Sequence, residues 1–271
     1  MTSVKPMLLT EYEEDKDTIF EKKDDYIFQE KFNGVRCMLH IKNGKVSAIR
    51  NRTDNPVLQL YPEVANITFD WTTTAIIDGE MCQIRDGKSY FYGGIDQRHK
   101  KLHDDRKEKF PVTFVAFDVI YLNGKMLTDL SYEERYKELE KILPTAENII
   151  LSKNIDDPKE FWNTEIVARN KEGLVAKLKT AKYELGIRSK NYLKLKYYKC
   201  AKVIVDKVED NPKGQKIYGH TKVEDQEILV ECQFSGKNMD IKDGQELNVE
   251  YLDTYNGKMI QPHKIKGEVI E

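Results

Sequence analysis

A lysine heads a strand-like run near the start of the chain, in the stretch EKFNGVR from Glu30 to Arg36. Lysine is normally a solvated surface charge, but its amine becomes a nucleophile where burial or neighbouring cations favour the unprotonated form. Arg36 follows Lys31 on the same run, and an arginine suits a phosphate-sized anion. Covalent chemistry on a phosphate is one hypothesis for this stretch, and charges that fringe a sheet edge are the other.

The dipeptide Asn43-Gly44 predicts how a second arginine reaches this lysine. Asn-Gly between alternating segments is typical of a two-residue hairpin turn, because both central residues need positive φ. Counting residue pairs outward from this turn places Arg52 opposite Val35. We therefore expect Arg52 at the start of the strand that Lys31 leads into.

Later segments add carboxylates, an aromatic ring and two more lysines in strand-like settings. The carboxylates and the ring are Glu80 in IDGEMC, Phe117 and Asp118 in FVAFDVIYLNG, and Glu172 at the start of EGLVAKLK. Lys194 and Lys196 alternate with leucines in YLKLK, so they share one face of a strand. Two lysines, two carboxylates for a divalent ion and a ring for a base would together make a nucleoside triphosphate site.

The elements that must position these residues form a mixed fold. The turns KNGK, RDGK and LNGK predict antiparallel hairpins in the first two thirds of the chain. A capping box at Ser131 predicts a helix that ends before Pro144, and a second helix is expected from Pro158 through Val167. After Lys202 the pattern is typical of strands alone. The sequence predicts an α+β fold, with a sheet-rich domain over 1–198 and a small β-barrel or sandwich over 199–271.

Composition narrows the class of protein. The chain of 271 residues has no apolar run of membrane-spanning length, and its acidic N-terminal segment does not fit a signal peptide. Its four cysteines form no CxxC pair, which argues against a zinc site and a secreted disulfide framework. We expect a cytoplasmic protein with no membrane segment.

Basic residues gather late in the first predicted domain, although the formal net charge of the chain is only −2. Between Lys177 and Lys202, nine lysines and arginines face a single acidic residue, Glu184. Such a stripe suits polyphosphate or a nucleic-acid backbone, and a solvated charged face is the alternative.

The chemistry-bearing residues also occur in a recognisable order: KFNGVR from Lys31, then Arg52-Thr53, Asp78-Gly79-Glu80, Phe117-Asp118, EGLVAK from Glu172, and LKLK from Leu193. This ordered set, over roughly residues 28 to 198, resembles the nucleotidyltransferase motifs of ATP-dependent DNA ligases. The resemblance implies an adenylation domain followed by an OB-fold domain. It also implies ATP and Mg²⁺ or Mn²⁺ as cofactors, nicked duplex DNA as partner, and a monomer. Ligases of this size resemble those of viruses and phages, for which the setting would be the host cytoplasm.

The resemblance assigns a role to each residue. Lys31 would attack the α-phosphate of ATP to form lysyl-AMP, the AMP would pass to the 5′-phosphate at a nick, and the 3′-hydroxyl would displace it. Lys194 and Lys196 would grip the α-phosphate during catalysis. The cofactor-binding residues would be Glu30 and Glu172, Arg36 and Glu80 on the ribose, Arg52 on the phosphates or the nick, and Phe117 on adenine. Glu172 and Glu80 would serve the metal, and Asp118 would support the site.

Two departures from the ligase pattern stand out. Asn33 takes the place of the usual aspartate, so we expect the loop to survive and the electrostatics around the lysine to differ. The C-terminal motif has no clear match. Lys264 and Lys266 are the nearest candidates, and the alternative is that they are exposed surface lysines.

His99 and His103 are four residues apart, but the charges around them favour a solvated segment over a metal site.

Other functions stay open at this point. An RNA ligase or an mRNA-capping guanylyltransferase of the same superfamily would use the same lysine chemistry. A non-catalytic OB-type protein that binds nucleic acid through its basic stripe is a third possibility, but such a module has no reason to hold Lys31, Glu80 and Glu172 together.

Overall fold

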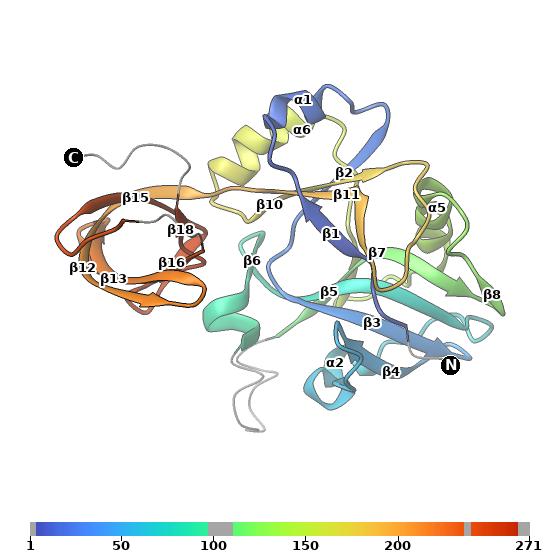
Figure 1. Cartoon of the computed structure of the whole chain (residues 1–271). Helices are drawn as coiled ribbons and strands as arrows, with labels where there is room; N and C mark the ends of the chain where they lie inside the picture. Colours follow the sequence, from blue (N-terminus) through green and yellow to red (C-terminus); the bar gives the residue numbers. More distant parts are fainter. Residues whose placement is uncertain (1–3, 97–110, 236–239, 265–271) are drawn as a thin grey trace. The chain divides into compact units, whose positions relative to one another are not determined.

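The computed structural model describes residues 4–96, 111–235 and 240–264 (Figure 1). The chain divides into two compact units, Met1–Leu195 and Lys196–Glu271, and the sequence predicted a boundary at 198. No helix among the described residues is long and apolar enough to cross a membrane.

Two sheets form the first unit. The smaller sheet has the order β1-β11-β10-β2, and its strands are β1 (Leu8–Glu11), β2 (Tyr26–Glu30), β10 (Gly173–Leu178) and β11 (Arg188–Lys196). The larger sheet has the order β4-β3-β5-β7-β8, with β6 paired to β5 and β9 paired to β7. Its strands are β3 (Val35–Lys42), β4 (Lys45–Asn51), β5 (Ala75–Arg85), β6 (Lys88–Tyr90), β7 (Thr113–Leu122), β8 (Lys125–Met126) and β9 (Ile149–Leu151).

Alternation along the strands makes two apolar cores in this unit. Leu39 and Ile77 point to one side of the larger sheet and belong to a core on that face. Met38 and Ile76, one residue away on the same strands, belong to a second core that also contains Tyr192 of the smaller sheet. The second core therefore lies between the two sheets, and Figure 1 shows β1, β10 and β11 passing over β3, β5 and β7.

Short helices connect the strands of the first unit. Helix α5 (Tyr132–Ile142) begins with the predicted capping box at Ser131. Helix α6 (Pro158–Phe161) starts at the expected proline and continues as a π-helix, η3 (Trp162–Val167). Phe20 of α1 (Lys16–Phe20) packs against Trp162, with ring centroids 6.0 Å apart. The remaining helical segments are η1 (Leu58–Leu60), α2 (Pro62–Ala65) and η2 (Phe91–Ile95).

The predicted hairpin register holds near the turn and is wrong beyond it. Lys42 pairs with Lys45 and Ile41 with Val46, as counted, but His40 pairs with Ala48. Ser47 is the extra residue of a β-bulge, which moves every later pair by one position. Arg52 therefore does not lie opposite Val35, and it falls in a turn after β4 has ended.

The second unit is built on one seven-stranded sheet in the order β16-β17-β14-β13-β12-β15-β18. The strands are β12 (Lys199–Asn211), β13 (Gly214–Val223), β14 (Gln226–Ser235), β15 (Glu246–Tyr251), β16 (Asp253–Tyr255), β17 (Lys258–Ile260) and β18 (His263–Lys264). Val203, Ile217, Val230 and Val249 belong to its apolar core. The sequence predicted strands with little helix here, and the described residues of this unit contain strands and turns.

Candidate active site

Lys31 and Glu172 meet at the end of the antiparallel pair β2 and β10. Leu174 lies opposite Glu30 in this pair, and the backbone N–H of Lys31 donates to the carbonyl of Gly173 at 2.9 Å. The two side chains that follow meet as well, because Lys31 Nζ lies 2.6 Å from Glu172 Oε1. The Glu172 side chain is 6% exposed and that of Lys31 is 18% exposed. The pair is therefore largely buried, and Lys31 is its more exposed partner.

The loop after Lys31 is pressed against β5. A Cβ atom on Gly34 would lie 2.2 Å from the carbonyl oxygen of Met81, which leaves room for glycine alone. The backbone N–H of Asn33 donates to Ser89 Oγ at 2.8 Å. This backbone contact needs no carboxylate, so the loop tolerates asparagine where aspartate was expected.

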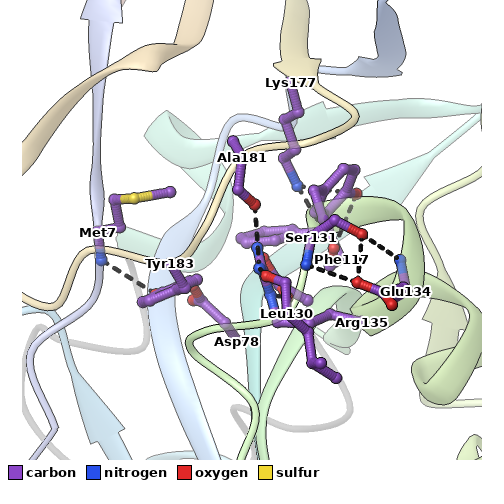
Figure 2. A network of polar contacts seen from close by, with 12 residues as sticks. Met7, Asp78, Phe117, Leu130, Ser131, Glu134, Arg135, Lys177, Ala181 and Tyr183 are labelled. Carbon is purple, nitrogen blue, oxygen red and sulfur yellow. Dashed lines mark hydrogen bonds and ion pairs between the residues drawn. The ribbon is translucent and has the colours of Figure 1, made fainter.

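Arg36 is held rigidly beside the pocket. Its guanidinium forms a bidentate pair with Asp78, with N···O distances of 2.5 and 2.6 Å, and the Asp78 side chain is fully buried. The hydroxyl of Tyr183 also donates to Asp78, and Figure 2 shows these two side chains beside each other. The Arg36 Nη2 group donates to the carbonyl of Met7. The guanidinium carbon lies 4.5 Å from the centroid of the Phe117 ring.

Glu80 stands directly opposite Arg36 on the neighbouring strand β5. Burial raises the pKa of the Glu80 carboxyl to about 7, although the positive charges of Lys31 and Arg36 act in the opposite direction. Glu172 and Asp78 add a smaller upward effect on this pKa. A carboxyl group surrounded by both cations and carboxylates is typical of a functional site.

A pocket between the two sheets brings these side chains together. Its lining includes Leu9, Gln29, Glu30, Lys31, Phe32, Arg36, Glu80, Phe117, Ser152, Val175, Lys177 and Tyr192. Glu30 pairs with Lys171 through Oε2 at 2.9 Å, and its other oxygen, Oε1, is buried with no partner among the described residues. A buried acceptor without a donor costs free energy, so it points to a ligand that supplies an N–H group.

Some predicted residues lie outside this pocket lining. Arg52 is exposed in its turn. Lys194 pairs with Glu11 of β1 at 2.9 Å, and Lys196, which belongs to the second unit, donates to Gln261 at 2.9 Å. The pocket lining therefore brings together four of the predicted cofactor residues, and Glu172 joins them through its pair with Lys31, whereas the two lysines of LKLK have separate partners.

The structure also adds residues that the sequence analysis missed. Lys177 was counted in the basic stripe, but it is 4% exposed and lines the pocket, so that interpretation of Lys177 was wrong. Its signal was present in EGLVAK, where it follows apolar residues on a strand whose first five residues are buried. Gln29 and Tyr192 also line the pocket, and nothing in their local sequence distinguishes them.

The carboxylates suit a hard divalent cation. Among the described residues no group of three or more histidines, cysteines and acidic residues converges on a metal-sized site. Mg²⁺ is commonly held by one or two carboxylates together with substrate phosphates, and Glu80 and Glu172 fit that pattern. Lys266, His99 and His103 lie outside the described residues, as does the side chain of Lys264, whose backbone ends β18.

Comparison with known proteins identifies relatives of this chain. The family model described as "ATP dependent DNA ligase domain" matches residues 6–196. A probable DNA ligase of Dictyoglomus turgidum is 32% identical over 200 residues, which are 70% of this chain and 34% of that protein. A DNA ligase of Thermococcus fumicolans is 29% identical over 203 residues, covering 71% and 36%. The chain thus spans about a third of the length of these curated relatives.

Solved structures show the same fold over nearly the whole chain. A structure described under "DNA binding with a minimal scaffold: Structure-function analysis of Lig E DNA ligases" superimposes with a TM-score of 0.66 at 19% identity, covering 96% of this chain and 98% of that one. The ligase domain of M. tuberculosis LigD gives a TM-score of 0.59 at 19% identity, covering 96% and 93%.

Proposed function

This chain belongs to the ATP-dependent DNA ligase domain family, and from that premise we propose that it joins 3′-hydroxyl and 5′-phosphate ends at nicks in duplex DNA. The observation that carries the proposal is the Lys31–Glu172 pair at the mouth of a pocket that also contains Arg36, Glu80 and Phe117. A nucleophilic amine, a base-sized slot with an aromatic wall and two carboxylates are the parts that transfer of a nucleotide to lysine requires.

In the first step the Lys31 amine attacks the α-phosphorus of ATP. A P–N bond forms, the bond to the bridging oxygen breaks, and pyrophosphate leaves with the electron pair. An ammonium ion cannot attack, so the proton that Lys31 shares with Glu172 must leave the amine first. Mg²⁺ held by Glu80, Glu172 and the phosphates would neutralise charge on the phosphates and weaken the hold of Glu172 on that proton.

The second step takes place at the same α-phosphorus, and the third takes place at the phosphorus of the 5′-phosphate. An oxygen of the 5′-phosphate at the nick displaces Lys31 from AMP, and the 3′-hydroxyl then attacks that 5′-phosphate and releases AMP. Lys194 would assist at the α-phosphate after exchanging Glu11 for the nucleotide. Lys196 would act there too, and Arg52, exposed in its turn, would contact the 5′-phosphate of the nick.

The base pocket favours adenine. The unpartnered Glu30 Oε1 is an acceptor that matches the exocyclic amino group of adenine, whereas a guanine in the same orientation would present a carbonyl oxygen. Phe117 and Val175 line the same pocket and would cover the two faces of the base.

The second unit contributes nucleic-acid binding in this proposal. We propose that its seven strands form an OB-fold barrel, because strand-only units of this size that follow an antiparallel-sheet domain suit that architecture. The protein would act as a cytoplasmic monomer on nicked DNA, since a nick presents one site to one active centre.

The test is incubation with ATP labelled on the α-phosphate and Mg²⁺, followed by denaturing electrophoresis and a chase with nicked duplex. We expect labelled wild-type protein that loses its label as a sealed strand appears. Lys31→Ala should reduce labelling to background, because no other group replaces the amine. The matched control is Lys182→Ala, which removes another ion-paired lysine, on the surface beside Asp129, and should label normally.

Other results would redirect the assignment. Labelling from GTP in place of ATP would indicate a capping guanylyltransferase, and a chase into single-stranded RNA alone would indicate an RNA ligase. No labelling of a folded, AMP-free sample by either nucleotide would contradict the enzyme hypothesis and favour a binding module.

A further inference from the structure

Two fully buried polar side chains of helix α5 lie behind the base pocket, and none of the steps above uses them. Tyr132 and Arg135 are each 0% exposed. Burial of an arginine is costly unless its charge and all its donors are satisfied. What these two side chains contact therefore indicates why the fold retains them.

Arg135 uses every donor that a guanidinium has. Nε and Nη2 form a fork with the two Asp118 oxygens at 2.8 and 3.0 Å, and Nη2 also donates to the Tyr192 hydroxyl at 2.7 Å. Nη1 donates to the carbonyls of Leu130 at 2.6 Å and Ala181 at 3.2 Å (Figure 2). The five N–H groups have five acceptors, which fixes Asp118 and Tyr192 in one geometry.

Tyr132, one turn earlier, holds the residue next to Asp118. Its hydroxyl lies 3.0 Å from the carbonyl oxygen of Phe117 and 3.0 Å from Gln29 Oε1. Lys177 Nζ completes the cluster, at 3.2 Å from the Tyr132 hydroxyl and 3.3 Å from the Phe117 carbonyl. Figure 2 shows the Lys177 side chain reaching toward Phe117 from the strand above it.

These contacts converge on one short piece of β7. The Phe117 ring lines the pocket, its carbonyl is held by Tyr132, and the next side chain, Asp118, is held by Arg135. Gln29 bonds to Tyr132 and Tyr192 bonds to Arg135, and both line the same pocket. The geometry points to α5 as a strut: we propose that Tyr132 and Arg135 are positioning residues that fix the Phe117 ring for nucleotide binding.

This inference rests on the proposed function and adds to it. A misplaced aromatic wall weakens binding of the base, whereas Lys31 and Glu172, which act at phosphorus, are held by their own pair at 2.6 Å. Loss of the strut should therefore raise the KM for ATP in self-adenylylation and leave the rate at saturating ATP unchanged.

Tyr132→Phe tests this with one atom, because the ring stays and only the hydroxyl is lost. We expect the KM for ATP to rise about fivefold to tenfold, as for loss of one buried hydrogen bond. Tyr136→Phe is the matched control: it lies on the same helix, is buried, and donates its hydroxyl to the Ser152 carbonyl at 2.9 Å. That carbonyl keeps a bond from Gln29 at 2.8 Å, so the control should retain the wild-type KM.

Arg135→Lys provides a second variant, which keeps the charge and loses the fork, and it should raise the KM in the same way. An unchanged KM in folded Tyr132→Phe would overturn the proposal. So would an equal rise in Tyr136→Phe, or a fall in the saturated rate with KM unchanged, because either would mean a general effect on the fold. If wild-type protein takes no label from ATP, the proposed function itself fails, and that result is read before any variant is compared.

Discussion

The first unit buries several charged side chains, whereas no charged side chain is buried among the described residues of the second unit. The Arg135 and Asp118 side chains, paired in the first unit, are 0% and 1% exposed. The Lys216 and Glu231 side chains, paired across β13 and β14, are 31% and 59% exposed. Among the described residues of the second unit, Thr221 is the one buried polar side chain, and the core around it is apolar.

The difference teaches where this chain places its chemistry. An apolar core is the less costly way to stabilise a small sheet unit, and the second unit uses it. The first unit instead buries Asp78 and Lys177 between its two sheets, and each has to be satisfied by a partner. Such an arrangement is retained where a ligand needs fixed charges, so the polar layer between the sheets marks the functional part of the molecule.

The largest effect should follow from breaking a buried pair. Arg135→Leu leaves Asp118 charged, buried and without its guanidinium, which should cost about 3–5 kcal/mol of unfolding free energy. Urea denaturation monitored by tryptophan fluorescence measures this loss of unfolding free energy, because Trp71 and Trp162 both lie in the first unit.

The control for that experiment breaks a pair in the second unit. Lys216→Leu removes one partner of the exposed pair with Glu231, whose charge water can solvate, so circular dichroism should show almost no change in the urea midpoint. Equal losses in Arg135→Leu and Lys216→Leu would contradict the contrast between the two units.

His40 should make the first unit sensitive to acid. It is 3% exposed, and its Nε2 atom has no partner among the described residues. The pKa of its imidazole is lowered to about 4. Burial is the main cause, the nearby charge of Arg50 acts in the same direction, and Asp54 has a smaller opposing effect. The unfolded chain takes up a proton near pH 6.5 and the folded chain does not, so stability falls as the pH drops from 6.5 toward 4.

The loss of unfolding free energy that this histidine causes between pH 6.5 and 4 is about 3 kcal/mol, and His40→Leu should abolish that loss. Urea midpoints measured by tryptophan fluorescence between pH 7 and 4.5 should fall less steeply in the variant than in the wild type. Parallel curves would show that His40 is protonated in the fold.

The sequence singled out the charged residues that meet at the pocket better than the residues that support them. Lys31, Glu80 and Glu172 stand out because a lysine or carboxylate in an apolar strand needs a reason, and their order along the chain narrows that reason. Asp118 and Arg135 are ordinary charges in sequence, 17 positions apart, and their pairing depends on how α5 packs on β7. Local patterns do not determine which distant charges meet in a core.

Backbone features show the same difference between what local sequence determines and what it does not. The capping box at Ser131 and the Asn43-Gly44 turn were predictable, because each depends on residues within a few positions. The bulge at Ser47 was not, and it alone moved Arg52 away from its expected position opposite Val35. A period of two along a strand gives the face of each residue only while no residue is inserted.

The smallest effect should come from the second unit, and its sign should be opposite to that of His40. A hydrogen bond from the imidazole to the Asp206 carboxylate, at 2.8 Å, raises the pKa of His220, whose side chain is exposed on β13. Folding therefore favours the charged ring, so His220 contributes stability below pH 6.5 that is lost as the pH rises through its raised pKa. An NMR titration should place this pKa above 6.5 in the wild type and close to 6.5 in Asp206→Asn, with the difference shrinking at high salt. A salt-independent pKa would mean that the pair is shielded from solvent, and the contrast between a buried polar layer in one unit and a solvated one in the other would then fail at this position.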